Sequence, residues 1–300
     1  MITKDFDWIF YVHFFNDIKS AGIDNEEKAY DHYKLHGNLE NRKISFDVDR
    51  FIRSNDVYGD SIFNFNRKNT SIFLVNKELM SYIIDNCKIE PDARVLEIGC
   101  SIACYSLPII KHVKNGAYYG LESNRHCLGW CRRKMKSSCP HALFRHLDLK
   151  ANQIIPDDIS ELDVVYSLST FITLQSYNIM KYLNEINRVL KKGGLLIISV
   201  FLANSLMNNQ TSTITTRTRQ LKASLTKNNG GLCLVNQLGE QANVYSDLQF
   251  QQWLDAAHFE IKDIIFGSWN IYSGTGVVQG TPTDISETIY QDLIVAIKIR

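Results

Sequence analysis

Short apolar runs that alternate with helical periodicity constrain the fold of this chain more than any other feature. Arg94–Ile98 and Leu162–Ser167 are apolar and bounded by turn residues, so we predict buried strands there. The spacing of apolar residues over Arg125–Met135 and Tyr177–Leu190 predicts amphipathic helices. Apolar strands that alternate with helices are typical of a parallel sheet covered by helices on both faces.

The remaining elements follow the same alternation. Helices are also expected over 76–86, 104–113 and 248–257, and strands over 116–121, 142–146, 195–201, 259–266 and 293–299. The last two strands are joined by a long loop without a helix, so they should be antiparallel, because parallel crossovers usually contain a helix. We therefore predict an α/β fold whose seven-stranded sheet has six parallel strands and one antiparallel strand. Lys191–Gly194 should close the helix before the fifth strand, with cations at its negative end and a glycine cap.

The first 53 residues differ in composition from the rest. They are rich in aromatic residues and histidine, with Gly22 and Gly37 placed as helix stops. In a chain of 300 residues, this change predicts a small helical module over 1–53 and a larger domain over 54–300. Within the larger domain, the segment 203–247 is expected to cover an acceptor pocket, and its Thr-rich part Asn208–Gln220 to be a lid or a loose loop.

Composition and charge exclude several classes of protein. The chain has 33 Lys and Arg against 32 Asp and Glu, so it has no overall electrostatic preference for nucleic acid or acidic membranes, although a local patch stays possible. The longest apolar run, Leu195–Ala203, is half of the roughly 20 residues that a membrane helix needs. Asp5 and Asp7 do not fit a secretory signal. We expect a cytoplasmic protein with no membrane span and no nucleic-acid partner.

The cysteines do not form a recognisable framework. Seven is an odd number, which fits reduced thiols. Cys100/Cys104 and Cys127/Cys131 are each four apart and could place two ligands on one helix face, but the favoured explanation is that they are small buried side chains. No accompanying residue falls at the usual spacing of a zinc set, so we expect no metal site.

Acidic and small residues follow three neighbouring strands. Val95–Ser101 runs from a strand into a tight turn, Glu122 ends the second strand 23 residues after Gly99, and Asp148 follows the third strand. Ligands of open α/β sheets bind beyond the carboxyl ends of the strands. At this spacing Glu122 can accept hydrogen bonds from ribose hydroxyls, and Asp148 from an adenine amino group. Either acid alone could be solvated, but the ordered set favours a nucleoside-containing ligand.

The turn after the first strand lacks the glycines of a dinucleotide site. Gly99 remains, whereas Ser101 and Ala103 follow it. Fewer glycines leave less room for a pyrophosphate but enough for a thinner ligand. Ser101 and Ala103 should be tolerated only with negative φ angles.

These residues resemble those of class I S-adenosylmethionine-dependent methyltransferases over about 71–300. Val95–Ser101 resembles the first motif, Leu162–Val165 the fourth strand, and Arg188–Gly194 the passage into the fifth strand. The resemblance implies a Rossmann-like sheet that binds S-adenosylmethionine and releases S-adenosylhomocysteine. The cofactor-binding residues that it implies are Glu97, Gly99, Cys100, Ser101, Glu122, Ser123, Asp148, Leu149 and Ser167.

Two further motifs, Gly267–Trp269 and Tyr290–Leu293, resemble a bacterial and viral subgroup linked to surface-polysaccharide synthesis. The implied reaction is O-methylation of a sugar or glycan precursor, with Phe171, Trp269 and Tyr290 as substrate contacts, although packing between the final strands explains Trp269 and Tyr290 equally well. A catalytically weak or inactive scaffold for glycan synthesis is the alternative, and a non-sugar small-molecule acceptor is a third.

The catalytic base is not evident. Thr173 stands where the subgroup has a histidine, and a threonine hydroxyl is no base at neutral pH. Glu240 and Asp247 are other candidates, although both also fit ordinary surface acids.

The N-terminal module resembles one found beside glycosyltransferases, through Phe6-Asp7, Ala21–Ile23, His32-Tyr33 and Gly37. The resemblance implies docking to a glycosyltransferase through residues 1–53. Core packing alone would also explain its histidines and aromatic residues.

Overall fold

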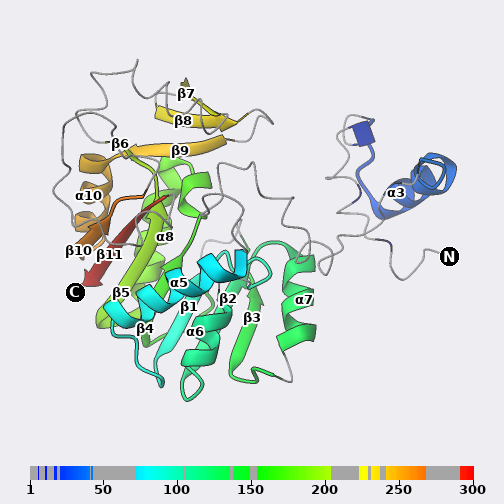
Figure 1. The fold of residues 1–300 in the computed structure, drawn as a ribbon. Coiled ribbons are helices and arrows are strands. Elements are labelled where there is room, and N and C mark those ends of the chain that lie inside the picture. The colour runs from blue at the N-terminus through cyan, green and yellow to red at the C-terminus, as the bar shows by residue number, and fades with distance from the viewer. Residues whose placement is uncertain are drawn as a thin grey trace. The chain divides into compact units, whose positions relative to one another are not determined.

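The computed structural model describes residues 6, 11, 17–18, 21–40, 42, 72–103, 106–135, 138–148, 154–203, 223–228, 231–236, 241–267 and 291–300. The chain divides into two compact units, Met1–Val57 and Tyr58–Arg300. Figure 1 shows the two units and the elements of each. No helix among the described residues is long and apolar enough to cross a membrane.

The larger unit is built on a seven-stranded sheet with the order β10-β11-β5-β4-β1-β2-β3. The strands are β1 (Arg94–Ile98), β2 (Ala117–Glu122), β3 (Ala142–His146), β4 (Leu162–Ser167), β5 (Leu190–Val200), β10 (Phe259–Ile265) and β11 (Asp292–Lys298). Strands β1 to β5 pair in parallel, and β11 is antiparallel to both β5 and β10. Six parallel strands and one antiparallel strand confirm the predicted sheet.

Helices cover both faces of this sheet (Figure 1). They are α5 (Ile72–Asn86), α6 (Leu107–His112), α7 (Arg125–Met135), α8 (Ser176–Val189) and α10 (Asp247–Ala256). One buried cluster joins Leu96 and Ile98 of β1 to α8 and α10, and a second joins Val95 to α5, α6 and α7. Alternate residues of a strand point to opposite faces, so a strand buried on both faces is apolar throughout.

The passage from α8 into β5 differs from the expected glycine cap. The helix ends at Val189 because Leu190 is already extended (φ −75°, ψ 145°), and β5 begins at that residue. Gly193 instead supplies a left-handed residue (φ +82°) inside β5, where the β4–β5 register shifts. Lys191 pairs with Asp163 of β4 at 2.9 Å. Gly193 therefore allows the irregular backbone within β5 and does not cap α8.

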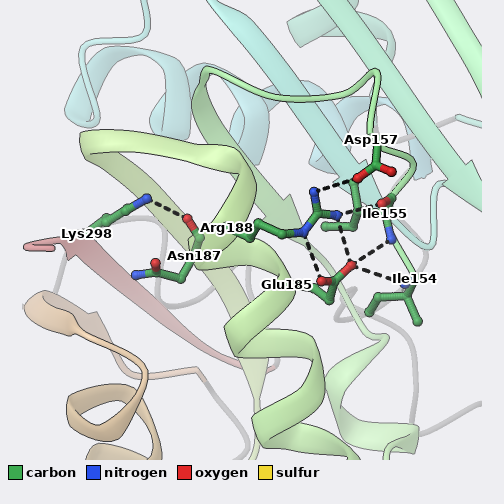
Figure 2. A network of polar contacts seen from close by, with 7 residues as sticks. All are labelled: Ile154, Ile155, Asp157, Glu185, Asn187, Arg188 and Lys298. Atoms are coloured by element: carbon green, nitrogen blue, oxygen red, sulfur yellow. Dashed lines mark hydrogen bonds and ion pairs between the residues drawn. The ribbon is translucent and has the colours of Figure 1, made fainter. Parts of the chain in front are cut away.

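A network of polar contacts holds α8 at the amino ends of the strands (Figure 2). Glu185 accepts hydrogen bonds from the Ile154 and Ile155 N–H groups, both at 3.2 Å, and from the Arg188 guanidinium at 3.0 Å. Burial raises the pKa of Glu185, but these donors outweigh it and hold that pKa below its usual value. Lys298 Nζ donates to the Asn187 and Leu190 carbonyls (2.6 and 2.7 Å), which end α8.

The segment predicted to cover the acceptor pocket contains strands that sequence analysis did not predict. A second sheet has the order β6-β9-β8-β7, with bounds β6 (Leu202–Ala203), β7 (Ala223–Asn228), β8 (Gly231–Asn236) and β9 (Gln241–Ser246). Tyr245 of β9 donates its hydroxyl to the Phe171 and Leu174 carbonyls at 2.8 and 2.6 Å. The sheet is thereby tied to the short 3-10 helix η2 (Phe171–Thr173), which follows β4. Asn208–Gln220 lies outside the described residues.

The smaller unit contains helix α3 (Glu26–His32), which continues into the π-helical turn η1 (Tyr33–Gly37). Asn25 caps α3 by accepting from the Lys28 N–H at 3.0 Å. A Cβ at Gly37 would lie 2.1 Å from the Tyr11 hydroxyl, so this close approach requires glycine. Tyr11 is fully buried and bonds to His32 Nδ1 at 3.0 Å. These contacts account for part of the aromatic and histidine content by core packing.

Candidate functional site

The turn after β1 lies at the carboxyl edge of the sheet and is tied to both neighbouring strands. The Gly99 and Cys100 N–H groups donate to the Leu121 carbonyl of β2, at 2.8 and 3.1 Å. On the other side, the Ser167 and Thr170 hydroxyls donate to the Ile98 carbonyl, at 2.8 and 3.1 Å. The backbone of the turn is therefore held in place by β2 and by the segment after β4.

Gly99 is required for a close approach by Thr170. Gly99 has φ +83°, and a Cβ there would lie 2.0 Å from Thr170 Oγ1. The left-handed angle and the close contact each favour glycine. The space beside the first glycine is thus filled by the chain's own threonine.

The expectation of negative φ at Ser101 and Ala103 is wrong. Their φ angles are +49° and +54°. A left-handed residue with a Cβ costs about 1–2 kcal/mol, and hydrogen bonds at the turn offset this cost. The Ala103 N–H donates to the Cys100 carbonyl at 2.7 Å, and the Cys131 thiol donates to the Ser101 carbonyl at 3.5 Å.

Glu122 lies beside this turn, as expected for the acid that ends the second strand. Its Oε2 accepts from the Ser101 N–H at 2.8 Å, and its Oε1 from the Asn124 N–H at 2.7 Å and the Ser123 hydroxyl at 3.3 Å. The residue is 9% exposed, whereas Ser101 and Ser123 are exposed. The structure thus brings the Gly99–Ser101 turn and Glu122 together at one open edge.

Glu97 faces the opposite way, into the sheet. Its Oε2 accepts hydroxyl hydrogen bonds from Ser106, Tyr118 and Tyr166, the last at 2.8 Å. Burial raises the pKa of Glu97 to about 7, although the three hydroxyl donors act in the lowering direction. The carboxyl group therefore braces β1, β2, β4 and the start of α6 beneath the edge. Glu97 was predicted to bind the cofactor, but from this buried position it could affect binding only by supporting the turn after β1.

Cys100 and Cys127 lie near Ser101 and have thiols that stay protonated. Contact with the Cys131 thiol and burial both raise the pKa of Cys100, and burial raises the pKa of Cys127 to about 12. In the part of the chain that the structure describes, no group of three His, Cys, Asp or Glu residues could hold a metal ion.

The third strand ends beside Glu122. His146 is its register partner, and the Leu147 N–H donates to the Glu122 carbonyl at 2.9 Å. Asp148 follows as an exposed residue. Leu149, also expected at this edge, lies outside the described residues. Ser167, the remaining predicted cofactor residue, is fully buried and supports the turn through the Ile98 carbonyl.

The predicted acceptor and base residues occupy different environments. Phe171 is fully buried against Tyr182 and Phe250, so the structure gives it a core position and not a place on an open surface. Thr173 is exposed in η2, and its hydroxyl donates to the Thr170 carbonyl at 2.7 Å. Asp247 begins α10, and its Oδ1 accepts from the Leu248 N–H at 2.7 Å, a normal role for an acid in the first turn. Glu240, Trp269 and Tyr290 lie outside the described residues.

Sequence reasoning missed a closed ring of hydrogen bonds across three strand ends. The Ser169 N–H donates to Ser199 Oγ (2.7 Å), Ser199 Oγ to Gln291 Oε1 (2.7 Å), and Gln291 Nε2 to Ser169 Oγ (2.9 Å). Ser169 is left-handed (φ +62°), and Ser199 and Gln291 are fully buried. The polar residues Gln291-Asp292 before an apolar strand were the available signal.

The two late motifs meet in the structure through Asp292. Its Oδ1 accepts from the Gly267 N–H at 2.9 Å, and its Oδ2 accepts from the Leu202 N–H at 2.8 Å. Asp292 is fully buried. It therefore joins the start of β11 to the end of β10 and to the start of the second sheet.

Known proteins share this architecture. Residues 95–194 match the family model of the methyltransferase domain. A protein from Pyrococcus horikoshii OT3 has 12% sequence identity and a TM-score of 0.55, with 85% of this chain and 100% of that chain covered. A S-adenosylmethionine-dependent methyltransferase from Clostridium acetobutylicum ATCC 824 has 11% identity and a TM-score of 0.53, with 84% and 98% covered. The magnesium protoporphyrin IX methyltransferase of Synechocystis PCC 6803, solved with bound SAH, has 14% identity and a TM-score of 0.51, with 89% and 97% covered.

The larger unit therefore has the Rossmann-like methyltransferase fold. The family match begins within β1 and ends within β5, so it contains the turn at Gly99, Glu122 and Ser167. At these low identities the structural likeness defines the fold and leaves the acceptor open.

Proposed function

We propose that this protein is a S-adenosylmethionine-dependent methyltransferase. The observation that carries the proposal is the Glu122 carboxylate, which lies at the carboxyl edge 2.8 Å from the N–H of Ser101 in the turn after β1. A carboxylate at the end of the second strand is placed to accept ribose hydroxyls beside a thin ligand that crosses this turn. The methyltransferase-domain match over 95–194 and the fold support the same cofactor.

The residues present fit this cofactor. The open edge offers a carboxylate acceptor at Glu122, exposed polar groups at Ser101 and Ser123, and the exposed acid Asp148. We infer that Glu122 binds the ribose and that Asp148 faces the adenine. When bound, S-adenosylmethionine supplies an electrophilic methyl group with a neutral leaving group. The protein then has to align the acceptor, and positioning alone contributes much of the acceleration.

Calorimetric titration with S-adenosylhomocysteine tests this proposal. Glu122→Ala should weaken binding about 10- to 150-fold, because a hydrogen bond to a charged group contributes about 1.5–3 kcal/mol. Glu90→Ala is the matched control, because Glu90 is an exposed acid before β1 at the amino end of the sheet. Circular dichroism would show that both variants fold. Equal affinities of wild type and Glu122→Ala would refute the ribose assignment.

We further propose that the acceptor is a hydroxyl of a sugar or cell-surface glycan precursor. This finer proposal rests on the resemblance of Gly267–Trp269 and Tyr290–Leu293 to the polysaccharide-linked subgroup. Transfer of a labelled methyl group to a panel of nucleotide sugars would test it. Thr173→His should raise turnover on an accepted sugar, because histidine can remove the hydroxyl proton and Thr173 is exposed after β4. Label that appears only in non-sugar acceptors would refute the sugar assignment.

We propose that residues 1–53 form a docking module for a glycosyltransferase and that the protein acts in the cytoplasm. The resemblance of this segment and the separate N-terminal unit support the docking role. A chain without residues 1–53 should keep its turnover on a soluble sugar and lose co-purification with the glycosyltransferase. Loss of turnover in a folded truncation would place the module at the active site instead.

A scaffold without catalysis is the second candidate function. Two observations favour it: Thr173 occupies the expected position of the base, and backbone N–H groups already engage both oxygens of Glu122. A folded protein that binds neither S-adenosylmethionine nor S-adenosylhomocysteine would support the scaffold. Micromolar binding of both would support the methyltransferase.

A further inference from the structure

The stretch between Glu122 and Asp148 is the most asymmetric part of the chain in charge. Its 25 residues contain six Lys and Arg and no Asp or Glu, in a chain whose net charge is +1. Within this stretch, Arg125–Met135 form α7 and Ala142–His146 form the edge strand β3, which lie beside each other at one end of the sheet (Figure 1). A nearly neutral protein thus concentrates positive charge in one stretch of its sequence.

Three arginines of α7 are exposed on this surface. Arg125, Arg132 and Arg133 are all exposed, whereas Leu128, Cys131 and Met135 of the same helix are buried in the core. Among the described residues, no carboxylate forms an ion pair with any of the three arginines. We call Arg125, Arg132 and Arg133 the α7 surface.

Within the described part of the chain, the other charged groups around α7 do not neutralise these arginines. Arg145 of β3 pairs with Asp158, so that acid is already matched. Glu122 is bound by backbone N–H groups at the carboxyl edge, and Asp148 follows β3 at that same edge. The positive field of α7 is therefore directed outward from the end of the sheet.

The arginines lie at the free edge of the sheet. Arg132 reaches toward the edge strand β3, since its Nε donates to the Phe144 carbonyl at 2.9 Å. Clustered Lys and Arg on a helix attract anionic lipid headgroups. Binding of single-stranded nucleic acid would instead favour exposed aromatic rings, but the aromatic Trp130 of α7 is packed against the core.

We propose that the α7 surface docks on the phosphate headgroups of an anionic lipid membrane. The helix begins at Arg125, directly after Glu122 and the turn at the carboxyl edge. Docking would therefore bring the candidate site next to the lipid surface. The interaction is electrostatic and peripheral, so it weakens as salt shortens the Debye length. It does not depend on the proposed methyl transfer.

Co-sedimentation with vesicles tests the docking. The wild type should sediment with vesicles of phosphatidylcholine and phosphatidylglycerol at low salt, and not with phosphatidylcholine alone. Each arginine near the surface should contribute about a fivefold increase in binding. The triple variant Arg125→Gln/Arg132→Gln/Arg133→Gln should therefore bind at least about tenfold more weakly.

The control variant removes the same charge elsewhere. Lys111, Lys114 and Lys192 are exposed and lie outside α7 and β3. If binding depends on where the charges lie, changing all three to Gln should leave vesicle binding within about twofold of wild type, because charges distant from the membrane are screened. Since Arg132 also bonds to β3, the double variant Arg125→Gln/Arg133→Gln repeats the test with that contact kept.

Several outcomes would overturn the proposal. The wild type would fail to sediment with anionic vesicles at low salt, or the α7 and control variants would lose binding equally. A third outcome is that the wild type binds an RNA or DNA oligonucleotide but no vesicles, and that the α7 variant loses the oligonucleotide binding. This result would assign the surface to nucleic acid.

Discussion

Glu97→Gln should change how the stability of the protein depends on pH. Burial raises the pKa of Glu97 in the folded protein from 4.5 to about 7. Between these two values the folded state holds the proton that the unfolded state releases. Stability therefore falls as the pH rises from about 4.5 through 7, because the folded state binds more protons in that interval.

The size of the effect follows from the two pKa values. Their separation corresponds to about 3 kcal/mol, most of which lies between pH 5 and pH 8. Glutamine cannot ionise, so Glu97→Gln lacks this dependence. It alters the bonds to Ser106, Tyr118 and Tyr166, but that change is the same at every pH. Relative to wild type, the variant should therefore gain about 2–3 kcal/mol between pH 5 and pH 8.

Urea unfolding followed by circular dichroism at several pH values measures this difference. Glu90→Gln, at an exposed turn position, controls for the loss of a carboxylate without burial. A difference between wild type and Glu97→Gln that stays constant from pH 5 to pH 8 would refute the reasoning. It would mean that Glu97 ionises in the folded protein as readily as in the unfolded chain.

Three further substitutions test the packing of the site and its support. Gly99→Ala should lower the free energy of unfolding by about 2–5 kcal/mol, because of the left-handed backbone and the contact with Thr170. Adding Thr170→Ala should recover the part that comes from the steric contact. If nothing is recovered, the backbone angle alone causes the loss. Ser101→Gly should stabilise the fold by about 0.5–1 kcal/mol in thermal unfolding, because glycine accepts φ +49° without strain, and a loss of stability would contradict the left-handed angle. Lys298→Met should cost about 1–3 kcal/mol in urea unfolding, because its ammonium group donates to the Leu190 carbonyl and to the Asn187 carbonyl, the latter drawn in Figure 2. An unchanged midpoint would show that water replaces these bonds.

The main sheet could be predicted from the sequence because its strands are buried on both faces. β1, β3 and β4 begin and end at the predicted residues, as does α7. A strand between two helical layers carries an uninterrupted apolar run, which short-range periodicity detects directly. Pro108 did not obstruct α6, since the helix begins at Leu107 and proline is tolerated in a first turn.

The second sheet could not be predicted in the same way. β7 and β9 contain several polar residues, so neither carries the uninterrupted apolar run of the strands in the main sheet. The available signal was a turn: β7 and β8 pair up to Asn228 and Gly231, so only Asn229-Gly230 separates the two strands, and this dipeptide is typical of a tight antiparallel hairpin.

The sequence predicted which strand ends meet at the candidate site, but it did not predict the backbone angles of the turn. The position of Glu122 beside the turn followed from strand order alone. The left-handed angles of Ser101 and Ala103 did not, because they accompany hydrogen bonds that involve other elements: the Glu122 carboxylate accepts from the Ser101 N–H, and the Cys131 thiol donates to the Ser101 carbonyl. A residue with a Cβ is expected to have a negative φ angle. At Ser101 and Ala103 the tertiary hydrogen bonds hold the backbone at a positive φ angle instead.

Under the proposed function, the same contacts set a limit on how strongly Glu122 can bind a ribose. A carboxylate accepts about four hydrogen bonds, and three donors already reach Glu122, from Ser101, Asn124 and Ser123. The two backbone donors hold the turn and are not free to leave, whereas the Ser123 hydroxyl is exposed and 3.3 Å away. A ribose diol therefore has to replace the Ser123 hydroxyl at Oε1. On binding, Glu122 loses the hydrogen bond from the Ser123 hydroxyl and gains two from the ribose. Its net contribution to the binding free energy is therefore smaller than that of two new hydrogen bonds.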